Sequence, residues 1–244
     1  MGDRFKGFNA PPRKCGRGVL ELMELRSESM TGRPVLAGRS VFLSASIPTR
    51  ERWDGEFNAR EITDAVVAAS RAVLTAGGVL VTAAHPTIAP LLLYVAGEFP
   101  PRASGEASVI TYQSSVFERV MPEATVRFRD LGIGEFRLTP AVLGDKAEFP
   151  LRNRSLLVMR EQMFAETKPI AAIFVGGMQG IREEYELLDS VSPTPIRYPV
   201  GRPGGEAARL PQTVDGELAA LLTSGDVYPT IFRAVLDDLV ARMS

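Results

Sequence analysis

Short apolar runs of strand type alternate with helix-type patterns from residue 40 to the end of the chain, and this alternation constrains the fold most. The runs are rich in β-branched and aromatic residues and are bounded by glycine, proline and other small residues. Such alternation is typical of βαβ units, because parallel strands need a helical crossover. We therefore predict an α/β fold with a doubly wound, mostly parallel, Rossmann-like sheet and helices on both faces.

Local spacing predicts the individual elements. Strands are expected at residues 40–44, 79–82, 109–112, 125–128, 171–175 and 195–198. Helices are expected at residues 59–76, 87–96, 115–121, 152–166 and 181–188, and around residues 231–240. Asn58 followed by Glu61 is typical of a helix start, and Gly77 is typical of a helix end.

The composition predicts one folded domain. The chain has 244 residues, of which 45% are hydrophobic, and this length falls within the range of a single large α/β domain. Residues 1–37 are basic and rich in glycine and proline, so we expect a loosely ordered arm that adds little to stability. Residues 38–244 are expected to form the folded domain.

Charge and cysteine usage exclude several function classes. A formal net charge of −1 supplies no basic field for a nucleic-acid backbone, which argues against DNA or RNA as a partner. No apolar stretch approaches the roughly 18 to 20 residues that span a membrane. Cys15 is the only cysteine and His85 the only histidine, so neither a disulfide within the chain nor an ordinary structural metal site is expected. We therefore expect a cytoplasmic protein.

Candidate ligand-binding residues follow the predicted strands. In parallel sheets, ligands bind outside the carboxyl ends of the strands, where helix N-termini attract anions. Small-residue loops at these ends, and the end of the third strand, give the candidates Ser44, Ala45, Ser46, His85, Pro86, Thr87, Tyr112, Gln113, Gly176, Gly177, Met178, Gln179, Gly180, Gly204 and Gly205. Tyr112 could stack on a base or pack at the sheet rim, and His85 could be an acid–base group or a neutral hydrogen-bonding ring.

Two segments of the chain, one helical and one a glycine loop, resemble those of a known family. The helix-type sequence MREQM, which contains Arg160, and the later GGMQGIREE are similar to the arginine helix and glycine loop of Lonely-Guy phosphoribohydrolases, within the SLOG superfamily. The segments SASIP, AAHPTIAP, TYQSSVFE and GGMQGIREEYEL resemble more closely the SLOG domains found beside TIR and sirtuin effectors in bacterial conflict systems. The likeness covers roughly residues 38 to 240.

The resemblance implies a pocket for a nucleotide derivative. It assigns phosphate to the glycine turn, and it places the two catalytic residues of the hydrolases at Arg160 and Glu184. Val175, Ile181 and Glu161 stand where the hydrolases carry proline, threonine and lysine, and Gln179 is read as an insertion. These departures favour a sensor that binds an ADP-ribose or cyclic ADP-ribose type of ligand without a cofactor and signals to a separate effector. The alternative is a phosphoribohydrolase that acts on a nucleoside monophosphate, and in either case we expect a homo-oligomer.

Overall fold

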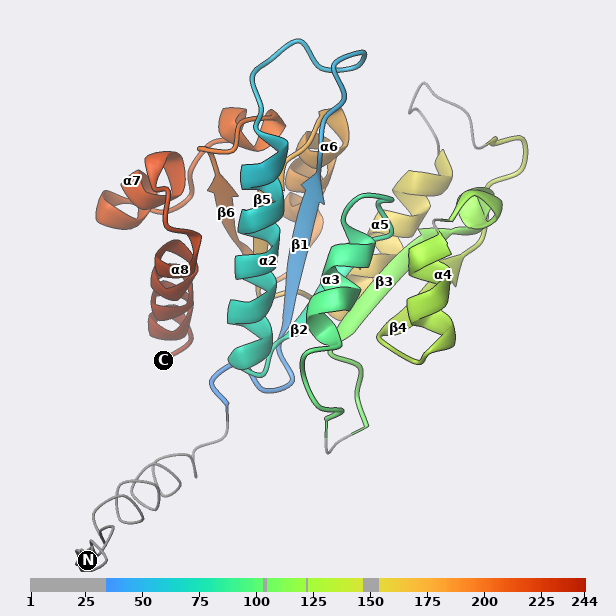
Figure 1. The fold of residues 1–244 in the computed structure, drawn as a ribbon, viewed down its shortest axis with the longest axis horizontal. Coiled ribbons are helices and arrows are strands. Elements are labelled where there is room, and N and C mark those ends of the chain that lie inside the picture. The colour runs from blue at the N-terminus through green and yellow to red at the C-terminus, as the bar shows by residue number, and fades with distance from the viewer. Residues whose placement is uncertain (1–33, 103–104, 122, 147–153) are drawn as a thin grey trace, which may run out of the picture. The chain divides into compact units, whose positions relative to one another are not determined.

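Six parallel strands form one sheet at the centre of the molecule (Figure 1). The structure is a computed structural model, and it describes residues 34–102, 105–121, 123–146 and 154–244. The strands are β1 (Ser40–Ser46), β2 (Val79–Ala83), β3 (Val109–Ser114), β4 (Glu135–Thr139), β5 (Ala171–Gly176) and β6 (Ile196–Val200). Their order is β4-β3-β2-β1-β5-β6, and every neighbouring pair is parallel. The predicted α/β class is therefore confirmed.

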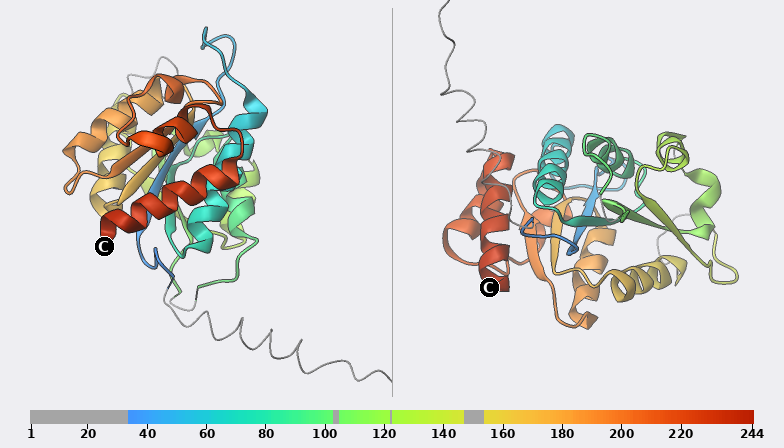
Figure 2. Two further views of the ribbon diagram at one scale, coloured as in Figure 1. Left: turned by 90° about the vertical axis from the view of Figure 1, so that its left-hand side faces the viewer. Right: turned by 90° about the horizontal axis from the view of Figure 1, so that it is seen from below.

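Helices cover both faces of this sheet (Figure 2). Helices α2 (Ala59–Thr75), α3 (Ala89–Ala96), α4 (Glu123–Asp130) and α8 (Tyr228–Met243) belong to one side, and α7 (Gly216–Ser224) packs near β6 and α8. Helices α5 (Arg154–Thr167) and α6 (Gln179–Leu187) cover the other side. Three short 3₁₀ helices complete the described part of the chain: η1 (Ser115–Val120), η2 (Leu188–Ser190) and η3 (Glu206–Arg209).

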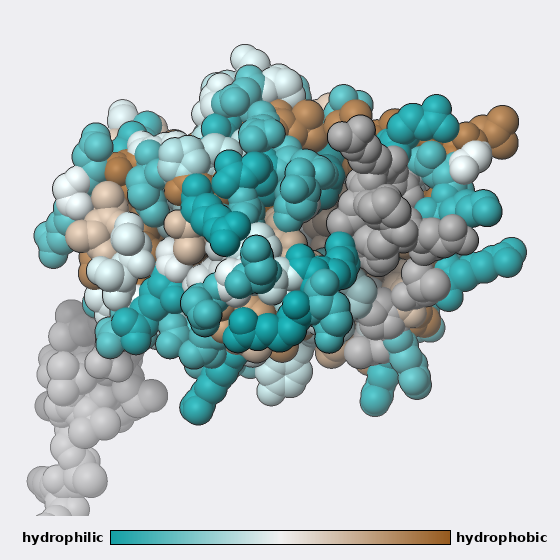
Figure 3. Space-filling view, turned by 90° about the horizontal axis from the view of Figure 1, so that it is seen from above, coloured by the Kyte–Doolittle hydropathy of each residue, from teal (hydrophilic) through white to brown (hydrophobic). Residues whose placement is uncertain are grey.

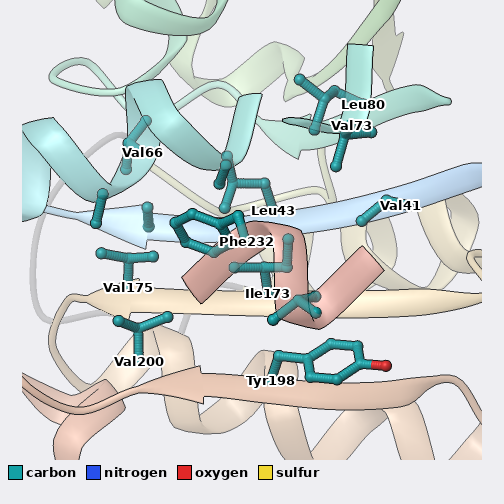
Figure 4. Close-up of a cluster of buried hydrophobic side chains, with 14 of the residues drawn as sticks. Val41, Leu43, Val66, Val73, Leu80, Ile173, Val175, Tyr198, Val200 and Phe232 are labelled. Carbon is teal, nitrogen blue, oxygen red and sulfur yellow. The ribbon is translucent and has the colours of Figure 1, made fainter. Parts of the chain in front are cut away.

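The alternation of side chains along the strands produces two apolar cores. Val41 and Leu43 of β1 point to the core under α2 and α8, which Figure 4 shows with Phe232 of α8 between the strands and the helices. Phe42 points to the opposite core, where its ring lies 4.9 Å from that of Phe164 in α5. Because β1 is buried on both faces, its central residues, Val41, Phe42 and Leu43, are all apolar.

Helix α2 begins and ends where its sequence predicts. The Asn58 side chain accepts hydrogen bonds from the backbone N–H groups of Arg60 and Glu61, at 3.1 and 3.2 Å. These bonds satisfy two N–H groups that have no partner inside the helix. The chain leaves the helix through Gly77, whose φ of +78° lies in the left-handed region.

One predicted strand was wrong, and the edge strand of the sheet was not predicted. Residues 125–128 were predicted as a strand, but they lie in α4, where Thr125 and Phe128 are three positions apart and so share the buried face of the helix. The strand that pairs with β3 on its outer side is β4. The sequence did not predict it, because its residues, EFRLT, are half-exposed and largely polar. This composition suits the edge of a sheet.

The compact unit begins slightly before the expected boundary. It spans Pro34–Ser244, and Leu36 is fully buried in the first core although the sequence reading placed it in the arm. The remainder of the expected arm, residues 1–33, lies outside the described residues.

Candidate functional site

The strand order reverses between β1 and β5, and we call the space outside the carboxyl ends of these two strands the crevice. The chain runs outward from β1 through β2, β3 and β4, and then returns to the other side of β1 to form β5 and β6. Ligands of open parallel sheets bind at such a reversal, outside the carboxyl ends of the strands. Ser46 and Gly176 are paired in register there, so the first and third small-residue loops do meet. Figure 3 shows this end of the molecule from above, with predominantly hydrophilic side chains.

The turn from β5 into α6 requires its two glycines. Gly176 and Gly177 have φ values of +64° and +76°, and the Gly177 N–H donates to the Ser46 carbonyl at 2.7 Å. A Cβ atom on Gly177 would lie 1.9 Å from Cδ1 of Ile181. Both glycines are buried, whereas Gln179 is exposed and Gly180 is half-buried. The first turn of α6 is therefore the part of this loop that is open to a ligand.

A buried ionic network lies beside this turn. Glu184 of α6 accepts a hydrogen bond from Ser44 Oγ at 2.5 Å and another from Arg160 Nε of α5 at 3.0 Å. Arg160 also donates to the Glu183 carboxylate at 2.8 Å and to the Gly180 carbonyl at 3.4 Å. The structure thus brings together four of the candidate residues, Ser44, Arg160, Gly180 and Glu184, and adds Glu183 to them.

The network holds more negative than positive charge. Glu184 is 9% exposed and Arg160 is 10% exposed at their side chains, whereas Glu183 is 37% exposed. Burial alone would lower the pKa of Arg160. The carboxylates of Glu184 and Glu183 raise it by more than burial lowers it, so the pKa of Arg160 lies above its ordinary value. Two carboxylates share one guanidinium, and so in this arrangement Arg160 offers little attraction for a phosphate.

His85 follows β2, at the next loop along this edge. Its Nδ1 lies 3.0 Å from Thr87 Oγ1, and its ring is half-buried. Burial, together with the positive charge of Arg52, lowers the pKa of His85 to about 4. The ring is therefore neutral at pH 7, with one nitrogen free to accept a hydrogen bond, while Pro86 and Thr87 are exposed beside it.

Tyr112 is a core residue in this structure. It is fully buried, and its hydroxyl donates to Glu166 of α5 at 2.5 Å and accepts from Arg137 of β4 at 2.8 Å. Burial and the Glu166 carboxylate raise its pKa to about 12. The ring is not presented to a ligand, so the packing interpretation describes Tyr112 better than the stacking one. Gln113 and Ala45 point to the opposite side of the sheet from Tyr112 and Ser44, and they are also buried.

A model of the SLOG cluster3 family matches residues 52–236. The chain belongs to this family. Since the match covers α2 through most of α8, it includes every element of the crevice except β1 and the start of the following loop. No curated protein matches the chain.

The SLOG domain closes its crevice with a loop that follows β6. Gly205 donates to the Glu56 carbonyl at 2.9 Å, and a Cβ atom on Gly205 would lie 2.5 Å from the carbonyl carbon of Gly176. Gly204 pairs with Phe57 in an isolated bridge. These contacts fix the loop after β1, the glycine turn and the loop after β6 to one another, so three of the four predicted loops converge.

The sequence reading missed several charged and aromatic residues at this edge. Glu206 follows Gly205, is buried, and accepts a hydrogen bond from Arg182 of α6. Trp53, in the loop after β1, lies under the guanidinium of Arg209. One signal in the sequence marked this loop, because Trp53 is the only tryptophan of the chain.

Other kinds of site find no support in the described residues. Among them, no group of three or more His, Cys, Asp or Glu side chains could hold a metal ion. None of the helices in the same residues is long and apolar enough to cross a membrane. Two hollows of about 280 and 230 Å³ lie away from the crevice, one between α5 and η2 and the other beside Gly77 and Phe99.

Proposed function

We propose that this SLOG domain binds a nucleotide-derived small molecule, of the ADP-ribose or cyclic ADP-ribose type, in the crevice between β1 and β5. The N-terminus of α6 opens onto this crevice, and the N–H groups at a helix N-terminus attract phosphate oxygens. The half-buried Gly180 lets a ligand approach these groups closely. Membership of the SLOG family supports the same position for the ligand.

The observation that carries a binding function rather than turnover is the closed state of the ionic network. Both carboxylate oxygens of Glu184 are already hydrogen-bonded, one to Ser44 and one to Arg160. A carboxylate that stabilises an oxocarbenium-like transition state must face the sugar. Glu184 instead holds β1, α5 and α6 together, and this arrangement suits a site that senses a ligand through the positions of these elements.

The biological setting that we propose is based on the resemblance to SLOG domains of bacterial conflict systems. SLOG domains beside TIR and sirtuin effectors serve bacterial signalling and antiviral defence, and we place this chain in such a system. A separate effector would read the bound state, and the domain would act as a homo-oligomer.

One observation favours the alternative, a phosphoribohydrolase. Arg160 and Glu184 are in contact beside the glycine turn, and the resemblance assigns catalysis to this pair. If a substrate displaced Ser44 and Glu183 from the pair, a carboxylate and a guanidinium would become available to a ribose phosphate.

A nucleotide panel separates the two functions. Purified protein is incubated with ADP-ribose, cyclic ADP-ribose, AMP and ribose 5-phosphate, and both thermal unfolding and released base are measured. A rise in melting temperature without free base supports the sensor. Free base in excess of protein supports the hydrolase, and the absence of any shift or product contradicts both.

A further inference from the structure

A tryptophan and an arginine form a stack at the edge of the crevice. Trp53 lies in a loop whose flanking residues Arg52 and Asp54 are exposed, yet Trp53 itself is only 9% exposed. The guanidinium carbon of Arg209 lies 4.3 Å from the centroid of the Trp53 rings. Figure 1 shows this loop, between β1 and α2, above the carboxyl end of the sheet.

The guanidinium is held in place from two directions. Arg209 Nη1 lies 3.9 Å from the carboxylate of Glu206, which is buried and also pairs with Arg182. A Cβ atom on Gly55 would lie 2.8 Å from Arg209 Nη2 and 2.9 Å from Trp53 Nε1. The absence of a side chain at Gly55 therefore leaves room for the stack. The loop after β1 contributes Trp53, η3 contributes Arg209 and Glu206, and α6 contributes Arg182.

One face of this stack remains open. The Arg209 side chain is 53% exposed although Trp53 covers its inner side, so the outer side of the guanidinium faces solvent. Nucleobases stack on guanidinium planes as they do on aromatic rings. The Trp53 Nε1–H is buried and has no hydrogen-bond partner among the described residues.

The stack lies within reach of the proposed phosphate position. The Glu206 N–H donates to the Gly177 carbonyl at 2.9 Å, which places the start of η3 on the glycine turn. A 3₁₀ helix rises about 2.0 Å per residue, so Arg209 lies on the order of 6 Å farther along η3. A nucleotide with its phosphate at the N-terminus of α6 can span this separation.

We infer that the outer face of Arg209, supported by Trp53, is the stacking surface for the base of the nucleotide-type ligand. This inference rests on the proposed function and adds to it a means of recognising a planar heteroaromatic ring. If the pair only fastened the loop to η3, removing the guanidinium plane would change stability but would not distinguish ligands with a base from ligands without one.

The test compares Arg209→Lys with the wild type, using AMP and ribose 5-phosphate as probes that differ in the base. Lysine keeps the charge but has no planar group. We expect Arg209→Lys to weaken AMP binding about tenfold or more in calorimetric titrations and to leave ribose 5-phosphate binding unchanged. Arg242→Lys, at an exposed ion pair of α8, is the matched control and should bind both probes as the wild type does.

Tryptophan fluorescence gives a second readout that needs no variant. Trp53 is the only tryptophan in the chain, so the emission reports this stack alone. AMP should change the emission of the wild type at saturation, and ribose 5-phosphate should not.

Three outcomes would each overturn the stacking surface and leave the proposed function standing. They are equal AMP affinity in wild type and Arg209→Lys, equal losses of affinity for both probes, and an unchanged emission on AMP binding. Binding of ribose 5-phosphate but not AMP would also overturn it, and failure of the wild type to bind either probe would contradict the stacking surface together with a nucleotide ligand of this kind.

Discussion

Arg160 Nε lies 3.0 Å from Glu184 Oε1, and the two residues join α5 to α6 at the edge of the β1–β5 crevice. Because both side chains are buried, loss of one partner leaves an uncompensated charge inside the protein. The pair is thus part of the fold as well as of the candidate site, and variants that test its function need a parallel test of stability.

The first prediction concerns that stability. Arg160→Met should lower the free energy of unfolding by about 3 kcal/mol or more, because Glu184 stays buried without its cation. The double variant Arg160→Met with Glu184→Gln should recover part of this loss, because neither charge remains. Urea unfolding measures both values. Arg242→Met breaks the ion pair between the exposed Arg242 and the half-buried Asp238 and should cost less than about 1 kcal/mol. Equal losses in the buried and exposed variants would contradict the prediction.

The second prediction concerns the excess carboxylate. Glu183→Gln removes the charge that competes with an anion for Arg160, so it should tighten AMP binding about tenfold. Glu186→Gln is the matched control, since Glu186 is exposed on the same helix. Calorimetric titration measures both. Weaker binding by Glu183→Gln would mean that Glu183 contacts the ligand directly.

The third prediction separates two glycines of the turn. Gly177→Ala should lower the free energy of unfolding by more than about 2 kcal/mol, because of its left-handed φ and the collision with Ile181. Gly180→Ala meets only Arg160 Nη2, at 3.0 Å, and should fold with a stability within about 1 kcal/mol of the wild type. Gly180 is therefore the better position at which to block a ligand. Similar losses in the two variants would contradict this assignment.

The fourth prediction is a pH dependence. Burial lowers the pKa of His85 from 6.5 to about 4, so the folded protein binds fewer protons than the unfolded chain between these values. The stability that depends on the neutral ring is fully present above about pH 6.5 and is lost as the pH falls toward 4.

His85→Gln provides the comparison for this effect. The stability of the wild type relative to His85→Gln should fall by about 1 to 3 kcal/mol between pH 7 and pH 4. Denaturant unfolding at several pH values measures the difference, in which the carboxylates common to both proteins cancel. No other histidine contributes, since the chain contains only this one. Parallel pH profiles for the two proteins would contradict the shifted pKa.

The sequence predicted the parts of the fold that depend on local pattern. Helix α2, with its Asn58 cap, and β5 with its glycine turn could be predicted because each is specified by neighbouring residues. The edge strand β4 and the helix at Thr125 could not, because short half-exposed segments carry little periodic signal.

The candidate site was only partly predictable for a related reason. The resemblance singled out Arg160 and Glu184, but the bond between Glu184 and Ser44 joins residues 140 positions apart, and no local pattern contains it. Likewise, nothing near Trp53 in the sequence indicates Arg209, because the contact depends on how the loops after β1 and β6 fold back together. For Tyr112, the strand-end position left stacking on a base and packing at the rim both open, and its complete burial, with its hydroxyl bonded to Glu166 of α5, decides for packing.

The most direct test of the sensing function compares wild type and Glu184→Gln with ADP-ribose and AMP, measuring heat of binding and released base in the same samples. In a sensor, Glu184 holds β1, α5 and α6 in the arrangement that binds the ligand, so Glu184→Gln should raise the dissociation constant while neither protein releases base. In a hydrolase, Glu184 acts on the transition state, so the wild type would release base. Glu184→Gln would then bind with similar affinity but turn over at least about 100-fold more slowly. The first result is the one we predict, and the second would contradict a sensing role.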